Sequence, residues 1–372
     1  MQDKHWQKDY PKGGLARRLH LDLPLLYGVF ALAIVGLIIL YSAANQNKAM
    51  VIQQTIRFAI AGVIMVVFAQ ISPKHYERWA PFIFIIGLFL LFATLLMGHI
   101  GKGAQRWLSL GVVRFQPSEI MKLGIPLILA WYFSSKPLPP RLKEIGIAGL
   151  LILVPVLLTA KQPDLGTALM LALSGAFVLL LAGMSWRLIT VLAVLFFASL
   201  PLLWHFMHTY QRDRVLTFLS PERDPLGAGY HIIQSKIAIG SGGLTGQGWL
   251  QGTQAQLDFL PEHATDFIFS VCGQEFGLIG ALVLLGLYLF ITFRGLYIAS
   301  QAQDTFSRLL ASSLSLTFFF SMFVNVGMVS GLLPVVGIPL PLVSYGGTSM
   351  VTFFGFFGIL MSIQTHRKLI GS

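Results

Sequence analysis

The sequence predicts an all-α polytopic membrane protein with ten transmembrane helices and a long extracytoplasmic loop between the seventh and the eighth. Of the 372 residues, 55% are hydrophobic and only 11% are charged, whereas a soluble domain carries roughly 25% charged residues. Apolar stretches of about 20 residues, the length of a membrane-spanning helix, recur from one end of the chain to the other. Region 207–265 interrupts them and is too long for a simple connector.

Hydropathy places ten spans along the chain, with boundaries that are uncertain by several residues. They cover residues 25–43, 54–71, 79–98, 118–134, 145–160, 166–183, 187–206, 268–293, 308–329 and 342–364. The expected organisation is a cytoplasmic N-terminal tail (1–22), a membrane domain (23–366) that includes the loop 207–265, and a cytoplasmic C-terminal tail (367–372). The N-terminal tail is too polar for a cleavable signal peptide, so the first span is retained.

The distribution of charged residues sets the expected orientation. Fifteen of the 26 basic residues lie in the termini and in loops on the terminal side of the membrane. The positive-inside rule therefore predicts that both termini are cytoplasmic. Nine of the 15 acidic residues lie on the opposite side or in the outer halves of spans. Because the rule does not place Asp and Glu, this bias indicates that the working face is the outer one.

The net charge and the cysteine count exclude other classes of protein. In a polytopic membrane protein a net charge of +11 is explained by lipid headgroups and loop topology, so no nucleic acid is expected as a partner. The one cysteine, Cys272, cannot form an intramolecular disulfide, and its apolar surroundings predict a buried thiol. The sequence contains no metal-ligand spacing of His and Cys, no nucleophilic serine elbow and no Walker loop.

Asp266 is the main candidate for a chemical role. It lies where the long loop returns to apolar sequence, in the stretch 259–270 (Phe-Leu-Pro-Glu-His-Ala-Thr-Asp-Phe-Ile-Phe-Ser). A carboxylate at the edge of a membrane is costly and needs a reason. Asp266 is either an N-cap or first-turn acid of the eighth span, or a catalytic carboxylate. Glu262, His263 and Glu275 are close in sequence, and a single cap does not need them.

The start of the fourth span combines an acid and a base. The sequence from Arg114 onward is Arg-Phe-Gln-Pro-Ser-Glu-Ile-Met-Lys, in which Pro117 suits the first helical turn. Glu119 and Lys122 are three residues apart and share a helical face, so they can form a local ion pair. A cation near a helix N-terminus opposes the helix dipole, which favours a functional role for Lys122.

Two other polar sets leave two interpretations open. Asp164, in the stretch 162–167 (Gln-Pro-Asp-Leu-Gly-Thr), is suited to be the N-cap of the sixth span and equally to be a functional acid. Arg212 and Arg214 in the long loop are either ordinary solvated charges or part of an anion site, because guanidinium groups bind phosphate in a fork.

These motifs resemble those of the SEDS family (shape, elongation, division and sporulation proteins), in particular its members that act in rod shape. The resemblance extends over nearly the whole chain, from about Leu23 to His366. The matching stretches are residues 103–108, 114–122, 162–167, 224–244, 259–269 and 337–347.

The resemblance implies an activity, a location and partners. The activity is the polymerisation of lipid II, an undecaprenyl-pyrophosphate disaccharide-peptide, into glycan strands for cell elongation. The location is the bacterial inner membrane, with ten spans, cytoplasmic termini and a periplasmic active face. The partners are a class B penicillin-binding protein, which is a transpeptidase, and other membrane proteins of the elongation complex.

The resemblance also marks site residues. The family's essential aspartate matches Asp266, its fourth-span acid and base match Glu119 and Lys122, and its outer arginine matches Arg114. The candidate substrate- and pyrophosphate-binding set is completed by Gln116, Asp164, Arg212, Arg214 and Ser344. Family members carry Arg-Gln near the outer start of the second span, where this chain reads Val-Ile-Gln-Gln-Thr-Ile-Arg over 51–57. Arg57, from the next turn, is the candidate substitute.

The implied reaction defines what such a site needs. A sugar hydroxyl replaces an α-linked pyrophosphate and the new bond is β, so the step inverts and requires one base. Pyrophosphate can leave without an acid when cations absorb its charge. We therefore expect Asp266 to be the base, with Arg114, Lys122 and Arg212 or Arg214 as cations.

The sequence shows no motif for a dedicated cofactor or metal site, and a divalent cation (Mg or Mn) that shares the pyrophosphate is compatible with it. Two other functions stay open at this point. A lipid II flippase would also carry intramembrane charges such as Glu119 and Lys122. A non-catalytic scaffold of the transpeptidase would need no base.

Overall fold

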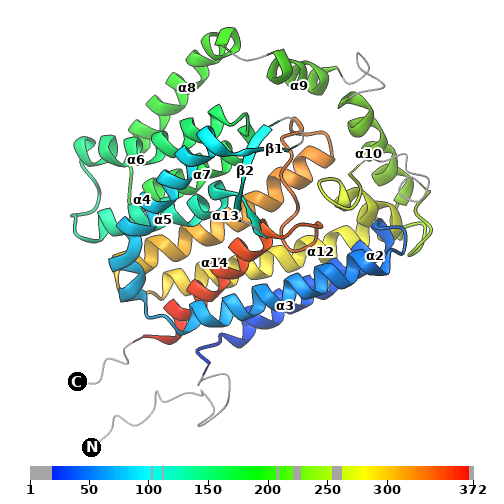
Figure 1. The fold of residues 1–372 in the computed structure, drawn as a ribbon, viewed down its shortest axis with the longest axis horizontal. Helices are drawn as coiled ribbons and strands as arrows, with labels where there is room; N and C mark the ends of the chain where they lie inside the picture. Colours follow the sequence, from blue (N-terminus) through cyan, green and yellow to red (C-terminus); the bar gives the residue numbers. More distant parts are fainter. Residues whose placement is uncertain are drawn as a thin grey trace, which may run out of the picture.

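The computed structural model describes residues 19–101, 104–110, 113–206, 209–220, 228–253 and 262–367, and most of these are helical (Figure 1). Ten helices of this part match the ten predicted spans. They are α2 (Leu23–Ala43), α3 (Lys48–Gln70), α4 (Pro73–Met97), α5 (Pro117–Ser134), α6 (Leu142–Lys161), α7 (Leu165–Leu181), α8 (Trp186–Phe206), α12 (Ile268–Ser300), α13 (Thr305–Val329) and α14 (Thr348–Thr365). Two more, α9 (Thr209–Leu219) and α10 (Ala228–Gly242), lie within the loop 207–265.

Length and composition agree with a membrane bundle. Seven of the described helices are long and apolar enough to cross a bilayer, while α7 and the apolar part of α8 are shorter. Helix α5 is more polar because its first turns contain Glu119 and Lys122. The predicted class, a ten-helix polytopic membrane protein, is thereby confirmed.

Capping residues explain where several helices begin. Asp22 caps α2 by accepting a hydrogen bond from Leu25 N at 3.0 Å. Asn47 caps α3, which therefore starts at Lys48, six residues before the predicted span. Helix α14 begins at Thr348 and not at residue 342, because residues 342–347 form a loop in which Leu342 has a φ of 65°.

The segment before α5 folds into a small antiparallel sheet that the sequence analysis did not predict. Its strands are β1 (His99–Gly101), β2 (Ala104–Leu110) and β3 (Val113–Phe115), in the order β1-β2-β3. His99 pairs with Trp107, and Ser109 pairs with Arg114. The sheet sets the direction in which the chain enters α5.

The core lies around α13 and α14, which are mostly buried, whereas α3 and α6 are mostly exposed. Phe318 of α13 stands at its centre and contacts Tyr288, Phe353 and Phe357 with ring centroids 5.2–5.6 Å apart. Large apolar side chains such as Phe89 of α4 point outward. Apolar side chains thus fill the interior of the bundle and also cover its outer surface, which is typical of helices that are surrounded by lipid.

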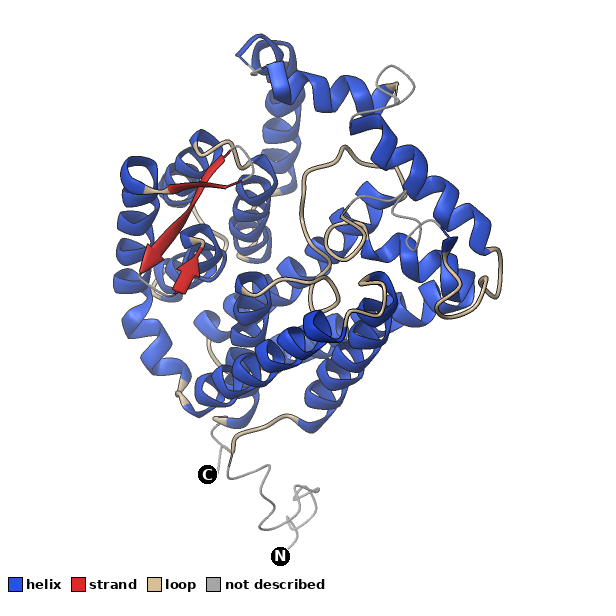
Figure 2. Cartoon of the chain, turned by 45° about the vertical axis from the view of Figure 1, so that its right-hand side comes forward, coloured by secondary structure: helices blue, strands red, loops and turns tan. Residues whose placement is uncertain are grey.

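Both ends of the described chain meet at one end of the bundle. The ring of His20 stacks on that of His366 with centroids 4.1 Å apart. The Arg294 guanidinium donates to both carboxylate oxygens of Asp22, at 3.0 Å from Nε and 2.6 Å from Nη2. We call this the terminal end. The opposite end, here the far end, carries the sheet and the loop 331–347 between α13 and α14. Figure 2 shows the strands on one side of this end and long loops in its middle.

Candidate active site

Asp266 lies at the far end, in the turn 262–267 that leads directly into α12. It is half-buried, and the next residue, Phe267, is buried. Helix α12 begins at Ile268, and its N-cap is Phe267, whose side chain forms no capping hydrogen bond. Asp266 therefore directly precedes the N-cap and does not belong to the first turn of α12.

The backbone of Asp266 and of the two residues before it is held by hydrogen bonds from distant segments. Asn325 of α13 donates through Nδ2 to the carbonyl oxygens of Asp266 at 2.8 Å and Ile338 at 2.7 Å. The Ser344 hydroxyl donates to Thr265 O at 2.5 Å, and Tyr345 N donates to Ala264 O at 2.9 Å. These bonds join the turn before α12 to α13 and to the α13–α14 loop (331–347).

Gly337 completes the surroundings of the carboxylate. Its φ of 73° lies in the left-handed region, which other residues adopt only with strain. A Cβ at this position would lie 3.5 Å from Asp266 Oδ2. The glycine thus lets the α13–α14 loop turn close beside the carboxyl group.

Ser344 was expected to bind substrate, and the structure gives its hydroxyl two protein partners. It donates to Thr265 O and accepts from Leu340 N at 2.8 Å. In addition, Gln54 of α3 donates to Ser344 O at 3.1 Å. Ser344 therefore ties α3, the α13–α14 loop and the turn of Asp266 together.

Glu119 and Lys122 form the predicted ion pair on α5, with Nζ 2.7 Å from Glu119 Oε1. Both side chains are nearly fully buried, and Lys122 lies 6.0 Å from the ring centre of Phe353 on α14. Among the described atoms, Glu119 Oε2 and Ser118 Oγ are buried without a hydrogen-bond partner. Buried polar atoms of this kind are typically satisfied by a ligand or by water.

Asp164 is an N-cap and also the centre of a polar cluster. Its carboxylate accepts from Thr167 N at 3.2 Å and from Thr167 Oγ1 at 2.8 Å, which caps α7. Gln116 Nε2 donates to the same carboxylate at 2.8 Å, and Arg106 Nε lies 3.7 Å from it. The two interpretations of Asp164 are therefore compatible, because one residue both caps α7 and binds other candidates.

The Asp164 cluster and Asp266 lie against the same loop. A Cβ at Gly166, in the first turn of α7, would be 2.5 Å from Val336 O, so the helix contacts the α13–α14 loop closely there. Val336 precedes Gly337, which borders Asp266. The loop thus connects Asp164 with Asp266.

Arg57 reaches the same loop from α3. Its guanidinium lies 4.4 Å from the ring centre of Tyr345, a cation–π contact, and its Nε lies 3.7 Å from the position of a Cβ on Gly347. Tyr345 is the residue whose amide binds the turn of Asp266. Arg57 therefore contacts the loop that borders Asp266.

The other predicted arginines are placed differently. Arg212 of α9 donates through Nε to Trp204 O at 2.9 Å and through one NH2 group to His205 O at 2.7 Å. These bonds join α9 to the end of α8. Arg114 lies in β3 and Arg214 in α9, but their side chains are outside the described part of the structure.

Sequence reasoning missed Arg106 and Asn325 as site residues. Arg106 lies in a motif that was quoted for the resemblance, and it also donates to Pro163 O at 2.6 Å. Asn325 is fully buried and stands in the apolar stretch of α13. A buried amide in a membrane span is the signal that could have identified it. Glu275, in contrast, is buried and accepts a hydrogen bond from Ser42 of α2. This contact joins α12 to α2.

His231 of α10 borders the site from the loop 207–265. Its ring stacks on Phe267 with centroids 5.8 Å apart and an interplanar angle of 18°. Burial lowers the pKa of His231, although the nearby Glu262 charge acts in the opposite direction. The described residues contain no group of three or more His, Cys, Asp or Glu side chains that could hold a metal ion.

The fold and this arrangement define a polytopic membrane protein with a structured polar site at one membrane face. The family model named for FtsW, RodA and SpoVE, with the description "cell cycle protein", matches residues 18–369, and the chain belongs to this family. The family expected from the motifs is thereby confirmed.

Related proteins of this family cover almost the whole chain. Peptidoglycan glycosyltransferase MrdB from Escherichia coli K12 is 56% identical over 354 residues, which are 95% of this chain and 96% of that protein. The crystal structure of the rod shape determining protein RodA from Thermus thermophilus matches with a TM-score of 0.71 and 28% identity, over 93% of this chain and 98% of that one. A structure described as the coordination of polymerization and crosslinking by a peptidoglycan synthase complex matches with a TM-score of 0.81 and 33% identity, over 94% and 98% of the two chains.

Proposed function

We propose that this protein is a peptidoglycan glycosyltransferase that polymerises lipid II into glycan strands for cell elongation. The name of the 56% identical E. coli relative supports the reaction class. It is a multi-pass protein of the bacterial inner membrane. In this proposal the termini are cytoplasmic and the far end faces the periplasm.

The observation that carries the proposal is the placement of Asp266. Three hydrogen bonds from α13 and the α13–α14 loop hold the backbone of the turn at Ala264, Thr265 and Asp266, directly before the N-cap of α12. A half-buried carboxylate with fixed geometry is suited to accept a proton in a reaction. Asp266 takes the proton of the attacking sugar hydroxyl, whose oxygen then bonds to the anomeric carbon as the bond to pyrophosphate breaks. The pyrophosphate leaves with the electron pair of that bond.

Basic residues around this position receive the negative charge that develops on the leaving group. Lys122, Arg57 and Arg106 are three described cations that α5, α3 and β2 place at the far end. Glu119 holds Lys122 in place, and its unpartnered Oε2 accepts a hydrogen bond from the substrate or from a water molecule. Arg114, Arg212 and Arg214 complete the proposed set from the outer segments, with Gln116, Asp164 and Ser344 as polar binding or positioning groups.

A divalent cation, Mg or Mn, belongs to the pyrophosphate in this proposal and not to a protein cage. One or two carboxylates together with phosphate oxygens are enough to bind Mg²⁺. Its role is to share the charge of the leaving group. Removal of divalent ions with EDTA should reduce polymerisation, and Mg²⁺ or Mn²⁺ should restore it. An undiminished rate in EDTA would count against this part of the proposal.

The partner in this proposal is a class B penicillin-binding protein that crosslinks the new strands, beside other membrane proteins of the elongation complex. The likeness to a structure described as a peptidoglycan synthase complex supports it.

The direct test is polymerisation by purified protein in detergent, where no membrane separates two compartments. Lipid II should be converted into glycan polymer when the transpeptidase partner is present. A flippase or a non-catalytic scaffold would make no polymer under these conditions, so the absence of product would reject the proposal.

A further inference from the structure

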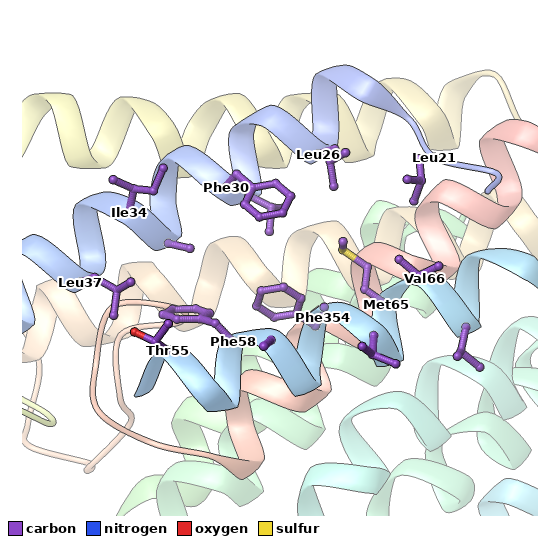
Figure 3. A pocket seen from close by; sticks show the side chains of 16 residues that line it. Leu21, Leu26, Phe30, Ile34, Leu37, Thr55, Phe58, Met65, Val66 and Phe354 are labelled. Atoms are coloured by element: carbon purple, nitrogen blue, oxygen red, sulfur yellow. The ribbon is translucent and has the colours of Figure 1, made fainter. Parts of the chain in front are cut away.

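An apolar groove lies between α2 and α3, on the membrane-spanning part of the bundle (Figure 3). Although these helices are consecutive in the chain, α2 packs mainly on α12 and α3 mainly on α14. The space between them has a volume of about 690 Å³. Figure 3 shows side chains of both helices pointing into it, with Phe354 of α14 at its base.

The lining of this groove is suited to hydrocarbon. Its one polar side chain, Thr55, donates its hydroxyl to Val51 O at 2.9 Å and so offers the groove no free donor. Phe30, Ile34 and Val63 along its rim are more than half exposed. The groove therefore opens sideways, toward the acyl chains of a bilayer.

One end of the groove reaches the candidate active site. Thr55 and Phe58 line this end, and Arg57 lies between them on α3. The Arg57 guanidinium rests on Tyr345, whose amide binds the turn of Asp266. In Figure 3 the α13–α14 loop passes beside the Thr55 end. A cation at the head of an apolar groove matches a ligand with an anionic head and an apolar tail.

The length of the groove suits an extended hydrocarbon chain. The groove follows α3 from Thr55 to Val67, which is about 18 Å at a rise of 1.5 Å per residue. One stretch of an extended hydrocarbon chain can therefore lie along α3, with its anionic head toward the Arg57 end.

We infer that this groove binds the polyprenyl chain of a lipid-linked substrate and leads its pyrophosphate toward Arg57 and the turn of Asp266. This inference rests on the proposed function and adds a binding site to it. A prenyl chain gains little by leaving an equally apolar bilayer. The groove therefore orients the substrate and supplies little affinity, so its effect should appear in kcat/KM for long chains.

Gly62 offers a way to fill the groove without disturbing the helices. It lines the groove, and a Cβ at this position would meet no atom within 4 Å. The variant Gly62→Phe places a ring in the space proposed for the chain. Gly149→Phe is the matched control, because Gly149 lies within the largely exposed helix α6 and its Cβ position is equally open.

The experiment compares two substrates with the same headgroup, lipid II with its full undecaprenyl chain and an analogue with a short prenyl chain. For Gly62→Phe we expect kcat/KM for the long-chain substrate to fall by roughly tenfold or more, the effect of one misfit group in an apolar pocket. The short-chain rate should stay at the wild-type level. Gly149→Phe should match the wild type with both substrates.

Equal long-chain rates for Gly62→Phe and wild type would overturn the inference, and so would an equal loss with both substrates. An inactive wild-type protein would reject the proposed function instead. A second measurement does not depend on variants: a photoreactive group in the middle of the prenyl chain should label peptides of α2 and α3 in the wild-type protein. Labelling confined to other helices would place the chain elsewhere.

Discussion

The replacement of Asn325 by alanine tests whether Asp266 depends on the hydrogen bonds that hold its backbone. Asn325 is fully buried, and its Nδ2 donates to Asp266 O and Ile338 O at 2.8 and 2.7 Å. Interhelical hydrogen bonds in membranes contribute about 0.6–1.7 kcal/mol each, so the two together contribute about 1–3 kcal/mol. If this energy selects the reactive position of Asp266, its loss lowers the rate roughly ten- to a hundredfold.

The assay is the initial rate of glycan polymerisation by purified Asn325→Ala with its partner, alongside the melting temperature of the variant. Ser321→Ala is the matched control, because Ser321 is also buried in α13 but its hydroxyl bonds only to Thr317 O of the same helix. The control should retain the wild-type rate.

A wild-type rate for Asn325→Ala would refute this reasoning. A loss of rate that follows only from unfolding, with a melting temperature below the assay temperature, would also refute a positioning role.

Three further outcomes follow from the contacts of the described residues. Glu119→Gln should lower the melting temperature because it leaves the buried Lys122 charge without its ion-pair partner, at a cost of about 3–5 kcal/mol. Adding Lys122→Met should restore stability but not activity. A double variant as unstable as Glu119→Gln alone would contradict this. Gly337→Ala should slow polymerisation, because a φ of 73° costs another residue about 1–2 kcal/mol, while Gly346→Ala, whose Cβ position is open, should not. Burial lowers the pKa of His231, so the contribution of this residue to stability is complete above its unfolded pKa of about 6.5 and is lost as the pH falls below that value. The melting temperature of the wild type should therefore fall more between about pH 7 and 5 than that of His231→Phe. Equal falls in the two proteins would exclude this contribution.

Most of the fold could be predicted from the sequence because helix length in a bilayer is fixed by its thickness. The ten apolar stretches therefore correspond to ten helices. Where prediction failed, short polar contacts decided the boundary. Asn47 caps α3, so this helix starts before the predicted span. The tenth helix, α14, starts after its predicted boundary because residues 342–347 form a loop that contacts α3 and the turn of Asp266. The sheet before α5 was missed because its strands are short and pair only with each other.

The site could be predicted only in part, because local spacing reveals only local pairs. Glu119 and Lys122 are three residues apart, and the structure pairs them as spacing suggests. Asn325 lies 59 residues from Asp266 in sequence, and their contact exists only after α12 and α13 have packed. Arg212 forms contacts that its position in the sequence does not reveal, because its guanidinium is bonded to the end of α8.

The central claim is that Asp266 accepts the proton of the attacking hydroxyl. The most direct measurement is polymer formation by purified Asp266→Asn with its partner, since Asn keeps the size of the side chain but accepts no proton at neutral pH. Glu262→Gln, at an exposed acid in the same turn, is the control and should stay active. We expect Asp266→Asn to be folded, to bind its partner and to form no polymer. Polymer formed by Asp266→Asn at a rate close to that of the wild type would contradict the claim.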